Sequence, residues 1–243
     1  MTSDLVLPGF LGIGAVKAGT TWLHHNLRPH PGLYLPIQKP VYFWDRHREK
    51  GLESYSRILS PGREQLIGEF TAAYSVLPKH TKQELRELIP DLKLVLVLRE
   101  PKSRAWSEAR MELTLIQERD ASELTTDDYL EFLRSKKCTE RGDYPAMIRA
   151  WLEFFPREQL FIGLYDDIIR RPQGFLTEIF NFLEVDVPDD WSGYPFTKKI
   201  FGGPVIEIPE ACAALLDEMY GEAEIAETAE LSGLDLQFAW LDA

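Results

Sequence analysis

The residues best suited to chemistry lie in the segment Gly14-Ala15-Val16-Lys17-Ala18-Gly19-Thr20-Thr21. The spacing of its glycines, G-x-x-x-x-G, lets backbone N–H groups surround an anion at the N-terminus of a following helix. A nucleoside triphosphatase would continue with Lys-Ser or Lys-Thr. Here Thr20 and Thr21 take those places, and the lysine is Lys17, inside the loop. The segment predicts a phosphate-binding loop whose lysine reaches the oxygen between a 5′-phosphate and the group leaving it.

A second candidate anion site follows the apolar run KLVLVL of residues 93–98. This run reads as a buried strand of a parallel sheet, and Arg99 directly after it would project into the crevice where α/β folds bind ligands. Ser107, two turns into the next predicted helix, would add a hydroxyl to the same anion. A triphosphatase needs an acidic residue at such a strand end to hold magnesium, and this strand ends in arginine.

The elements that must position these residues alternate along the chain. Strands are expected at residues 10–15, 65–70, 93–98 and 160–165, with short extended pieces at 33–35 and 41–44. Helices are expected at residues 20–27, 78–89, 101–118, 126–134, 145–155 and 172–183. This alternation predicts a three-layer, P-loop-like α/β fold with a central parallel sheet flanked by helices. With no repeat or low-complexity linker, residues 1–243 are expected to form a single domain.

The charge of the chain is distributed unevenly. The formal net charge is −12, but residues 1–110 carry +5 and residues 111–243 carry −17. The overall acidity argues against a nucleic-acid binder or a protein of anionic membranes, which need a cationic excess. Residues 205–243 hold ten acidic side chains and no Lys or Arg, with apolar residues at helical spacing, so we expect an acidic helical cap there.

Cysteine usage and hydropathy bear on compartment and metal content. Cys138 and Cys212 share no short-spaced motif, so neither a metal site nor a disulfide framework is expected. The first residues lack the pattern of a signal peptide, and no apolar stretch approaches the roughly 20 residues of a membrane span. The sequence therefore predicts a cytoplasmic protein without a resident metal.

Together these segments resemble the sulfotransferases that use 3′-phosphoadenosine 5′-phosphosulfate (PAPS), over residues 8–203 and in particular the heparan-sulfate-type branch and bacterial small-molecule enzymes. Residues 39–45 (KPVYFWD) are similar to the family's K-E-x-H-F-F-D segment, and residues 68–74 (GEFTAAY) to its G-E-K-T-P-x-Y segment. Arg141-Gly142-Asp143-Tyr144 resembles its R-G-x-Y segment, and the later matches are Trp151, Phe155-Pro156 and Gln159-Leu160.

The resemblance implies roles for individual residues. Lys17, Ala18, Gly19, Thr20, Thr21 and Trp22 would grip the 5′-phosphosulfate, and Arg99 with Ser107 would hold the 3′-phosphate. Tyr144 would contact the nucleotide. Lys198, Lys199, Phe201, Gly202 and Gly203 would belong to a loop closing over the adenosine 3′-phosphate. The implied reaction is an in-line sulfuryl transfer to an acceptor hydroxyl with adenosine 3′,5′-bisphosphate (PAP) as the product and no metal.

One position departs from the family. The heparan-type enzymes place a general-base glutamate where this chain has Pro40, and proline cannot accept a proton. The candidates for a replacement are Glu69 first, then Asp45 and His47, and more weakly His24 or His25. An acceptor acidic enough to need little help is the other solution.

Two other function classes stay open. A P-loop kinase predicts magnesium dependence and a lysine after Gly19, which is absent; a non-catalytic nucleotide-binding module would explain Pro40. The acceptor is expected to be a small hydroxylated molecule or a glycan-type compound, because a heparan-like polymer would need a broad basic cleft. The sequence leaves the oligomeric state open.

Overall fold

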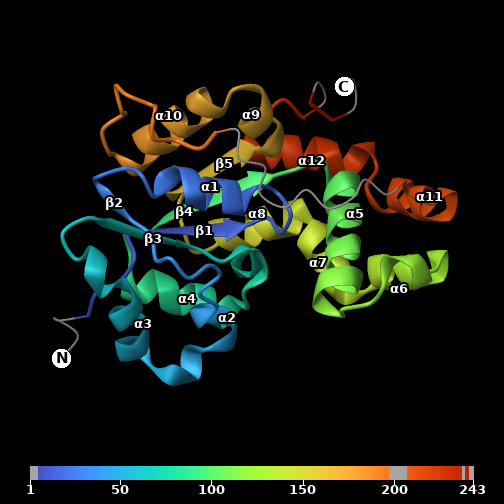
Figure 1. Cartoon of the computed structure of the whole chain (residues 1–243), viewed down its shortest axis with the longest axis horizontal. Coiled ribbons are helices and arrows are strands. Elements are labelled where there is room, and N and C mark those ends of the chain that lie inside the picture. The colour runs from blue at the N-terminus through green and yellow to red at the C-terminus, as the bar shows by residue number, and fades with distance from the viewer. Residues whose placement is uncertain (1–4, 197–206, 237–238, 241–243) are drawn as a thin grey trace.

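The computed structural model describes residues 5–196, 207–236 and 239–240. Its centre is a five-stranded sheet in the order β2-β3-β1-β4-β5, in which every pair is parallel (Figure 1). The strands are β1 Phe10–Gly14, β2 Leu33–Tyr34, β3 Leu66–Phe70, β4 Lys93–Leu98 and β5 Leu160–Leu164. The predicted α/β fold with a central parallel sheet is confirmed.

The sheet forms because its strands are apolar on both faces. Every residue of β1 is buried, as are Leu94–Leu98 of β4. Close packing inside the sheet requires glycine at Gly12, where an added Cβ would lie 1.8 Å from Phe70. Because all strands run in the same direction, their carboxyl ends meet at one edge, and the loops after β1, β3, β4 and β5 are brought together there.

Helices cover both faces of the sheet. In Figure 1, α1, α9 and α10 lie above it, α2, α3 and α4 lie below, and α5, α6 and α7 extend to the right. Their bounds are α1 Thr20–Leu27, α2 Phe43–Arg46, α3 Leu52–Leu59, α4 Lys79–Leu88, α5 Pro101–Met111, α6 Thr126–Arg134, α7 Lys136–Gly142, α8 Tyr144–Leu152, α9 Tyr165–Arg170, α10 Pro172–Leu183, α11 Glu210–Met219 and α12 Glu222–Ser232. Among the described helices, none has the length and apolar content that crossing a membrane requires.

Two local predictions were wrong. Residues 41–44 are not extended: Tyr42 adopts a left-handed conformation (φ 58°) and α2 follows it, because Phe43 stacks on Tyr55 at 4.3 Å and the Tyr74 hydroxyl accepts the Trp44 N–H. The predicted helix over 101–118 ends at Met111 and continues as a π-helical turn, Glu112–Ile116. The short helices α3, α7 and α9 were not predicted.

The acidic C-terminal region is helical as predicted, in α11 and α12. Asp217 pairs with Lys102 of α5 at 2.5 Å, and Glu227 pairs with Arg149 of α8. Cys212 of α11 is fully buried in a second apolar cluster with Cys138 and Trp106, and both thiols are free. Acidic residues of this region therefore form ion pairs with cations elsewhere in the chain, and apolar packing holds the helices in place.

A buried charge network joins α5 to α7. Glu108 receives one hydrogen bond from Arg104 and another from Arg141, both at 2.5 Å, and Arg104 also donates to the Cys138 carbonyl. Arg104 and Glu108 are inaccessible to solvent. Within the described residues, Glu108 is thus the one carboxylate that pairs with both arginines.

Replacing Glu108 by alanine should destabilise the fold by about 3–5 kcal/mol, because the buried Arg104 and the partly buried Arg141 lose their counter-charge. Urea unfolding measures this. The matched control is Glu140→Ala, which removes an exposed pair with Lys136 and should cost about 0.5 kcal/mol or less. If both variants lose the same small amount of unfolding free energy, the network does not stabilise the fold.

Candidate active site

The phosphate loop connects β1 to α1 at the carboxyl edge of the sheet. The Ala15 N–H donates to the Val97 carbonyl at 2.8 Å, which ties the loop to β4. Lys17 and Gly19 both have left-handed backbones, with φ 68° and 88°. At Gly19 an added Cβ would lie 2.6 Å from the Ile168 side chain, so glycine is required there for conformation and for space.

The N-terminus of α1 is open toward this loop. The helix begins at Thr20, and no side chain caps it. The first N–H groups of a helix have no partner within the helix, and they carry the positive end of its dipole. The loop therefore lies between a strand and a helix, and its binding of an anion stays a prediction.

Arg99 and Lys17 are brought together at the strand ends. An Arg99 Nη1 donates to the Lys17 carbonyl at 3.2 Å, and its guanidinium lies 4.7 Å from the centre of the Tyr165 ring. The buried Tyr144 hydroxyl donates to the Arg99 carbonyl at 2.8 Å. Burial, and then the charges of Arg99 and Arg110, lower the pKa of Lys17. These contacts fix the arginine against the loop.

Lys39 is the residue that the site prediction missed. Its Nζ lies 2.9 Å from the Thr21 hydroxyl and 3.3 Å from the Thr20 hydroxyl, at the first turn of α1. Burial lowers its pKa to about 8, opposed by the charge of Glu69. Lys39 belongs to a segment that was recognised for its resemblance, but nothing local in the sequence indicates that it reaches residues 20 and 21.

Three cations thus gather around the loop without a carboxylate partner. Lys17, Lys39 and Arg99 form no ion pair within 4 Å among the residues that the structure describes; the lysine Nζ atoms contact only the Met111 sulfur (3.7 Å) and the threonine hydroxyls. Partly buried cations are normally paired. Their position near a helix N-terminus is suited to a multiply charged anion, and the binding of such an anion here stays a prediction.

Glu69, the first candidate for the base, lies at the end of β3 with 1% of its surface exposed. It accepts hydrogen bonds from Tyr55 (3.2 Å) and Thr71 (2.8 Å). Burial raises its pKa to about 7 against these hydrogen bonds. The Thr71 hydroxyl also accepts the N–H groups of Val41 and Tyr42, so Glu69 helps to hold the segment that carries Lys39.

The other base candidates differ in accessibility. The Asp45 side chain is 16% exposed and lies beside Arg46, and burial raises its pKa. His47 is on the surface, 3.8 Å from Glu49. His24 is buried, its Nε2 is 2.8 Å from the Pro36 carbonyl, and burial lowers its pKa to about 4. His25 packs edge-on against His24.

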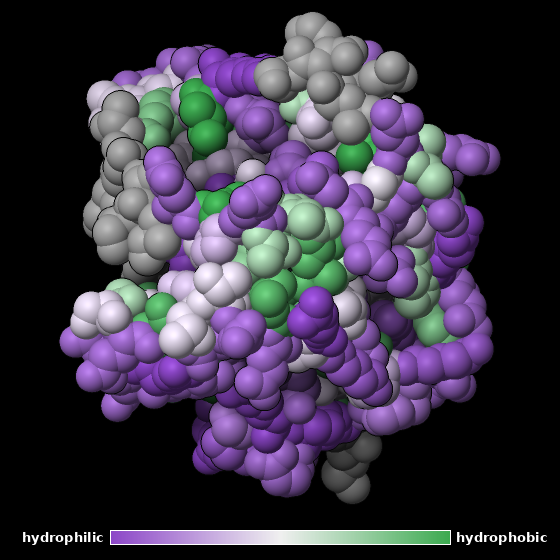
Figure 2. Space-filling view, turned by 90° about the vertical axis from the view of Figure 1, so that its right-hand side faces the viewer, coloured by the Kyte–Doolittle hydropathy of each residue, from purple (hydrophilic) through white to green (hydrophobic). Residues whose placement is uncertain are grey.

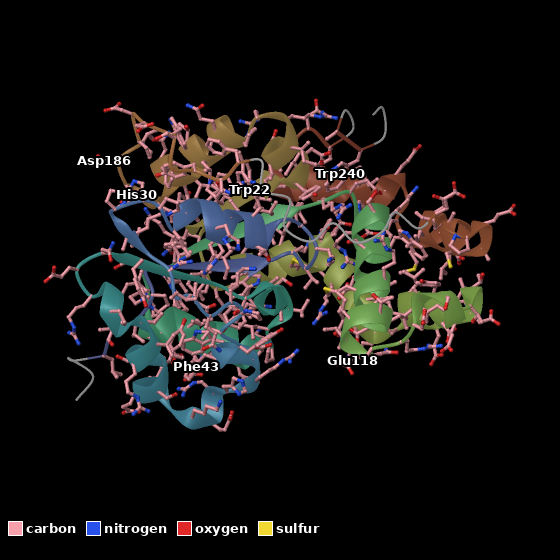
Figure 3. All side chains as sticks on the ribbon, in the orientation of Figure 1. Trp22, His30, Phe43, Glu118, Asp186 and Trp240 are labelled. Atoms are coloured by element: carbon pink, nitrogen blue, oxygen red, sulfur yellow. The ribbon has the colours of Figure 1, made fainter. Side chains whose placement is uncertain are left out.

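The remaining predicted residues fall into three groups. Ser107 is partly exposed on α5, eight residues after Arg99, and its contact with a phosphate stays a prediction. Trp22, shown on α1 in Figure 3, is buried and donates its indole N–H to the Phe196 carbonyl at 3.0 Å. Lys198, Lys199, Phe201, Gly202 and Gly203 lie outside the described residues.

Comparison with known proteins decides the family. Residues 8–193 match the sulfotransferase domain family. The chain belongs to this family. Relatives include the membrane-associated sulfotransferase kil1 of Dictyostelium discoideum, 24% identical over 75% of this chain and 57% of that protein. Heparan sulfate glucosamine 3-O-sulfotransferase 3B1 of Mus musculus is 30% identical over 73% of this chain and 46% of that protein.

The chain spans about half the length of these relatives. Among solved structures, a sulfotransferase from Alicyclobacillus acidocaldarius superposes with a TM-score of 0.75 at 22% identity, covering 96% of this chain and 99% of that one. The sulfotransferase domain of the Synechococcus PCC 7002 olefin synthase superposes with a TM-score of 0.60 at 18% identity, over 96% and 95% of the two chains. These likenesses confirm the fold.

The raised pKa of Glu69 predicts how the stability of this protein depends on pH. The folded state holds the Glu69 proton more tightly than the unfolded chain, so stability is full below pH 4.5 and is lost as the pH rises through about 7. The loss from this group should be roughly 3 kcal/mol. This contribution is measured from the unfolding free energies of the wild type and Glu69→Gln between pH 4 and 8. The stability of the variant relative to the wild type should increase as the pH rises through this range. A constant difference between the two proteins would contradict the prediction.

Proposed function

We propose that this chain transfers a sulfuryl group from PAPS to the hydroxyl of a small-molecule or glycan-type acceptor. The observation that carries the proposal is the gathering of Lys17, Lys39 and Arg99 at the carboxyl edge of the sheet, where none of the described residues gives them a carboxylate partner. Family membership supports it. PAPS carries anionic groups at both ends, and the chain offers cations at the loop for one end and Arg99 with Ser107 for the other.

The residues of the chain would act through position and charge. PAPS supplies the sulfuryl group and a 5′-phosphate that leaves. The bond between sulfur and the bridging oxygen breaks with its electron pair staying on that oxygen, while the acceptor oxygen bonds to sulfur and gives up its proton. Lys17 would stabilise the charge that develops on the bridging oxygen, and the N–H groups of α1 would hold the phosphate.

Two carboxyl groups remain candidates for receiving the acceptor's proton, since Pro40 cannot. The charge of Glu69 acts on Lys39, which contacts Thr20 and Thr21, and its pKa of about 7 suits a base at neutral pH. Asp45 is more open to an acceptor. We propose Glu69 as the base and Asp45 as the competing candidate.

Turnover at saturating acceptor separates them. Glu69→Gln should lower kcat by about 10²-fold or more, the usual contribution of a general base, while Asp45→Asn stays close to the wild type. Since Gln keeps the size of the side chain, a folded variant is expected. The reverse ranking would assign the base to Asp45, and a near-wild-type rate for Glu69→Gln would remove Glu69.

The acceptor class rests on charge and on the relatives. Two relatives are named for heparan sulfate glucosamine, which supports a glycan-type hydroxyl. The net charge of −12 instead favours a small acceptor over a polyanion. The face in Figure 2, the right-hand side of Figure 1, gathers hydrophobic residues at its centre within a mostly hydrophilic surface. A cytoplasmic location and a single domain stay predictions of the sequence.

Ligand-induced thermal stabilisation tests the cofactor. PAP without magnesium should raise the Tm of the wild type, whereas ADP with magnesium should not. Lys17→Ala should abolish sulfuryl transfer and leave the unfolding free energy nearly unchanged, because within the described part of the chain the Lys17 ammonium contacts the Met111 sulfur and no carboxylate. Stabilisation by ADP and magnesium alone would indicate a kinase, and binding of PAP without any transfer in the wild type would indicate a non-catalytic module.

A further inference from the structure

The Lys39 ammonium lies beside the hydroxyl that binds a metal ion in P-loops of the triphosphatase type. In G-x-x-x-x-G-K-[ST], the final hydroxyl holds magnesium. The equivalent residue here is Thr21, and the Lys39 Nζ lies 2.9 Å from its hydroxyl. The lysine of the pattern is replaced by Thr20, whose hydroxyl is also within 3.3 Å of the same Nζ. One ammonium therefore faces both the replaced position, Thr20, and the retained hydroxyl, Thr21.

This ammonium has unused hydrogen-bonding capacity. An ammonium group has three N–H donors, and the described residues supply two acceptors, both neutral hydroxyls. Glu69 acts on Lys39 through its charge, but no ion pair within 4 Å joins them in the described part of the chain. The two Glu69 oxygens instead accept hydrogen bonds from Tyr55 and Thr71. The cation is thus left for a ligand.

The backbone of Lys39 is held on both sides. The Pro36 carbonyl lies 2.8 Å from the His24 Nε2, and the N–H groups of Val41 and Tyr42 bind the Thr71 hydroxyl at 3.1 and 3.3 Å. These anchors come from α1 and from the end of β3, which are parts of the sheet-and-helix framework. Groups fixed in this way need little reorganisation to bind a charge.

We propose that Lys39 is a second cation for the 5′-phosphosulfate, standing where a P-loop triphosphatase holds magnesium. This inference rests on the proposed function and adds a residue to it. When the bond between sulfur and the bridging oxygen breaks, the electron pair stays on the 5′-phosphate, and Lys39 shares with Lys17 the stabilisation of that charge. The proton of the acceptor goes to the base, and Lys39 keeps its own.

Two ligands that differ by one phosphate test the position of Lys39. Binding of PAP and of adenosine 3′-monophosphate is measured by calorimetry in EDTA for the wild type, Lys39→Met and the exposed-lysine control Lys50→Met. Lys39→Met should weaken PAP by roughly ten- to a hundredfold, the contribution of a hydrogen bond to a charged group. It should leave adenosine 3′-monophosphate within about twofold of the wild type. Lys50→Met should match the wild type for both ligands.

Each other outcome has a defined meaning. If Lys39→Met binds PAP as tightly as the wild type, or loses both ligands equally, the proposal for Lys39 is overturned while PAP binding stands. If the wild type does not bind PAP, the proposed function itself fails. Magnesium that tightens PAP binding to the wild type by about tenfold or more would also overturn the assignment. Should Lys39→Met not fold, Lys39→Gln serves in its place.

The pH dependence of binding gives an independent readout. The titratable groups that act on Lys39 or feel its charge are Glu69, from β3, and His24, from α1, which is neutral at pH 7. Because the pKa of Lys39 is lowered to about 8, the affinity of the wild type for PAP should fall between pH 7 and 9. The affinity of Lys39→Met for PAP should not fall over this pH range. If the affinities of the two proteins fall in parallel, the proposal is contradicted.

Discussion

The site depends on positive charge that the described residues leave unbalanced at the edge of the sheet where its parallel strands end. Lys17, Lys39 and Arg99 are drawn toward one loop, and the described residues offer them hydroxyls, a sulfur, a carbonyl and an aromatic ring in place of carboxylates. Such an arrangement costs stability in the absence of a ligand, since desolvated cations are left unpaired. An anion with charge at two ends would remove this cost, so we expect ligand binding to stabilise the fold.

Much of the surrounding structure serves to keep these cations in place. Glu69 and Thr71 at the end of β3 hold the segment after Lys39, and Tyr144 holds the backbone of Arg99. Farther out, Glu108 accepts hydrogen bonds from the buried Arg104 of α5 and the partly buried Arg141 of α7. Carboxylates are thus present near the site but are engaged by hydroxyl or guanidinium groups rather than by the free cations.

The features predicted from the sequence are those that depend on neighbouring residues. The glycine loop, the strand KLVLVL and Arg99 after it are contiguous patterns, and the structure places them together because parallel strands end at one edge. Lys39 was not predicted as a site residue, because its approach to Thr20 and Thr21 depends on the path of the segment between them. Residues 41–44 were misjudged for a similar reason: their β propensity yields to packing of Phe43 on Tyr55. The roles of Ser107 and of the base depend on a bound substrate, so they stay predictions.

A crystal structure with PAP, grown in EDTA, tests the central claim most directly. The account predicts the 5′-phosphate at the N-terminus of α1, within about 3 Å of the Nζ atoms of Lys17 and Lys39, and the 3′-phosphate on Arg99 and Ser107. A 5′-phosphate bound away from the loop, or a nucleotide bound in the opposite direction, would contradict it.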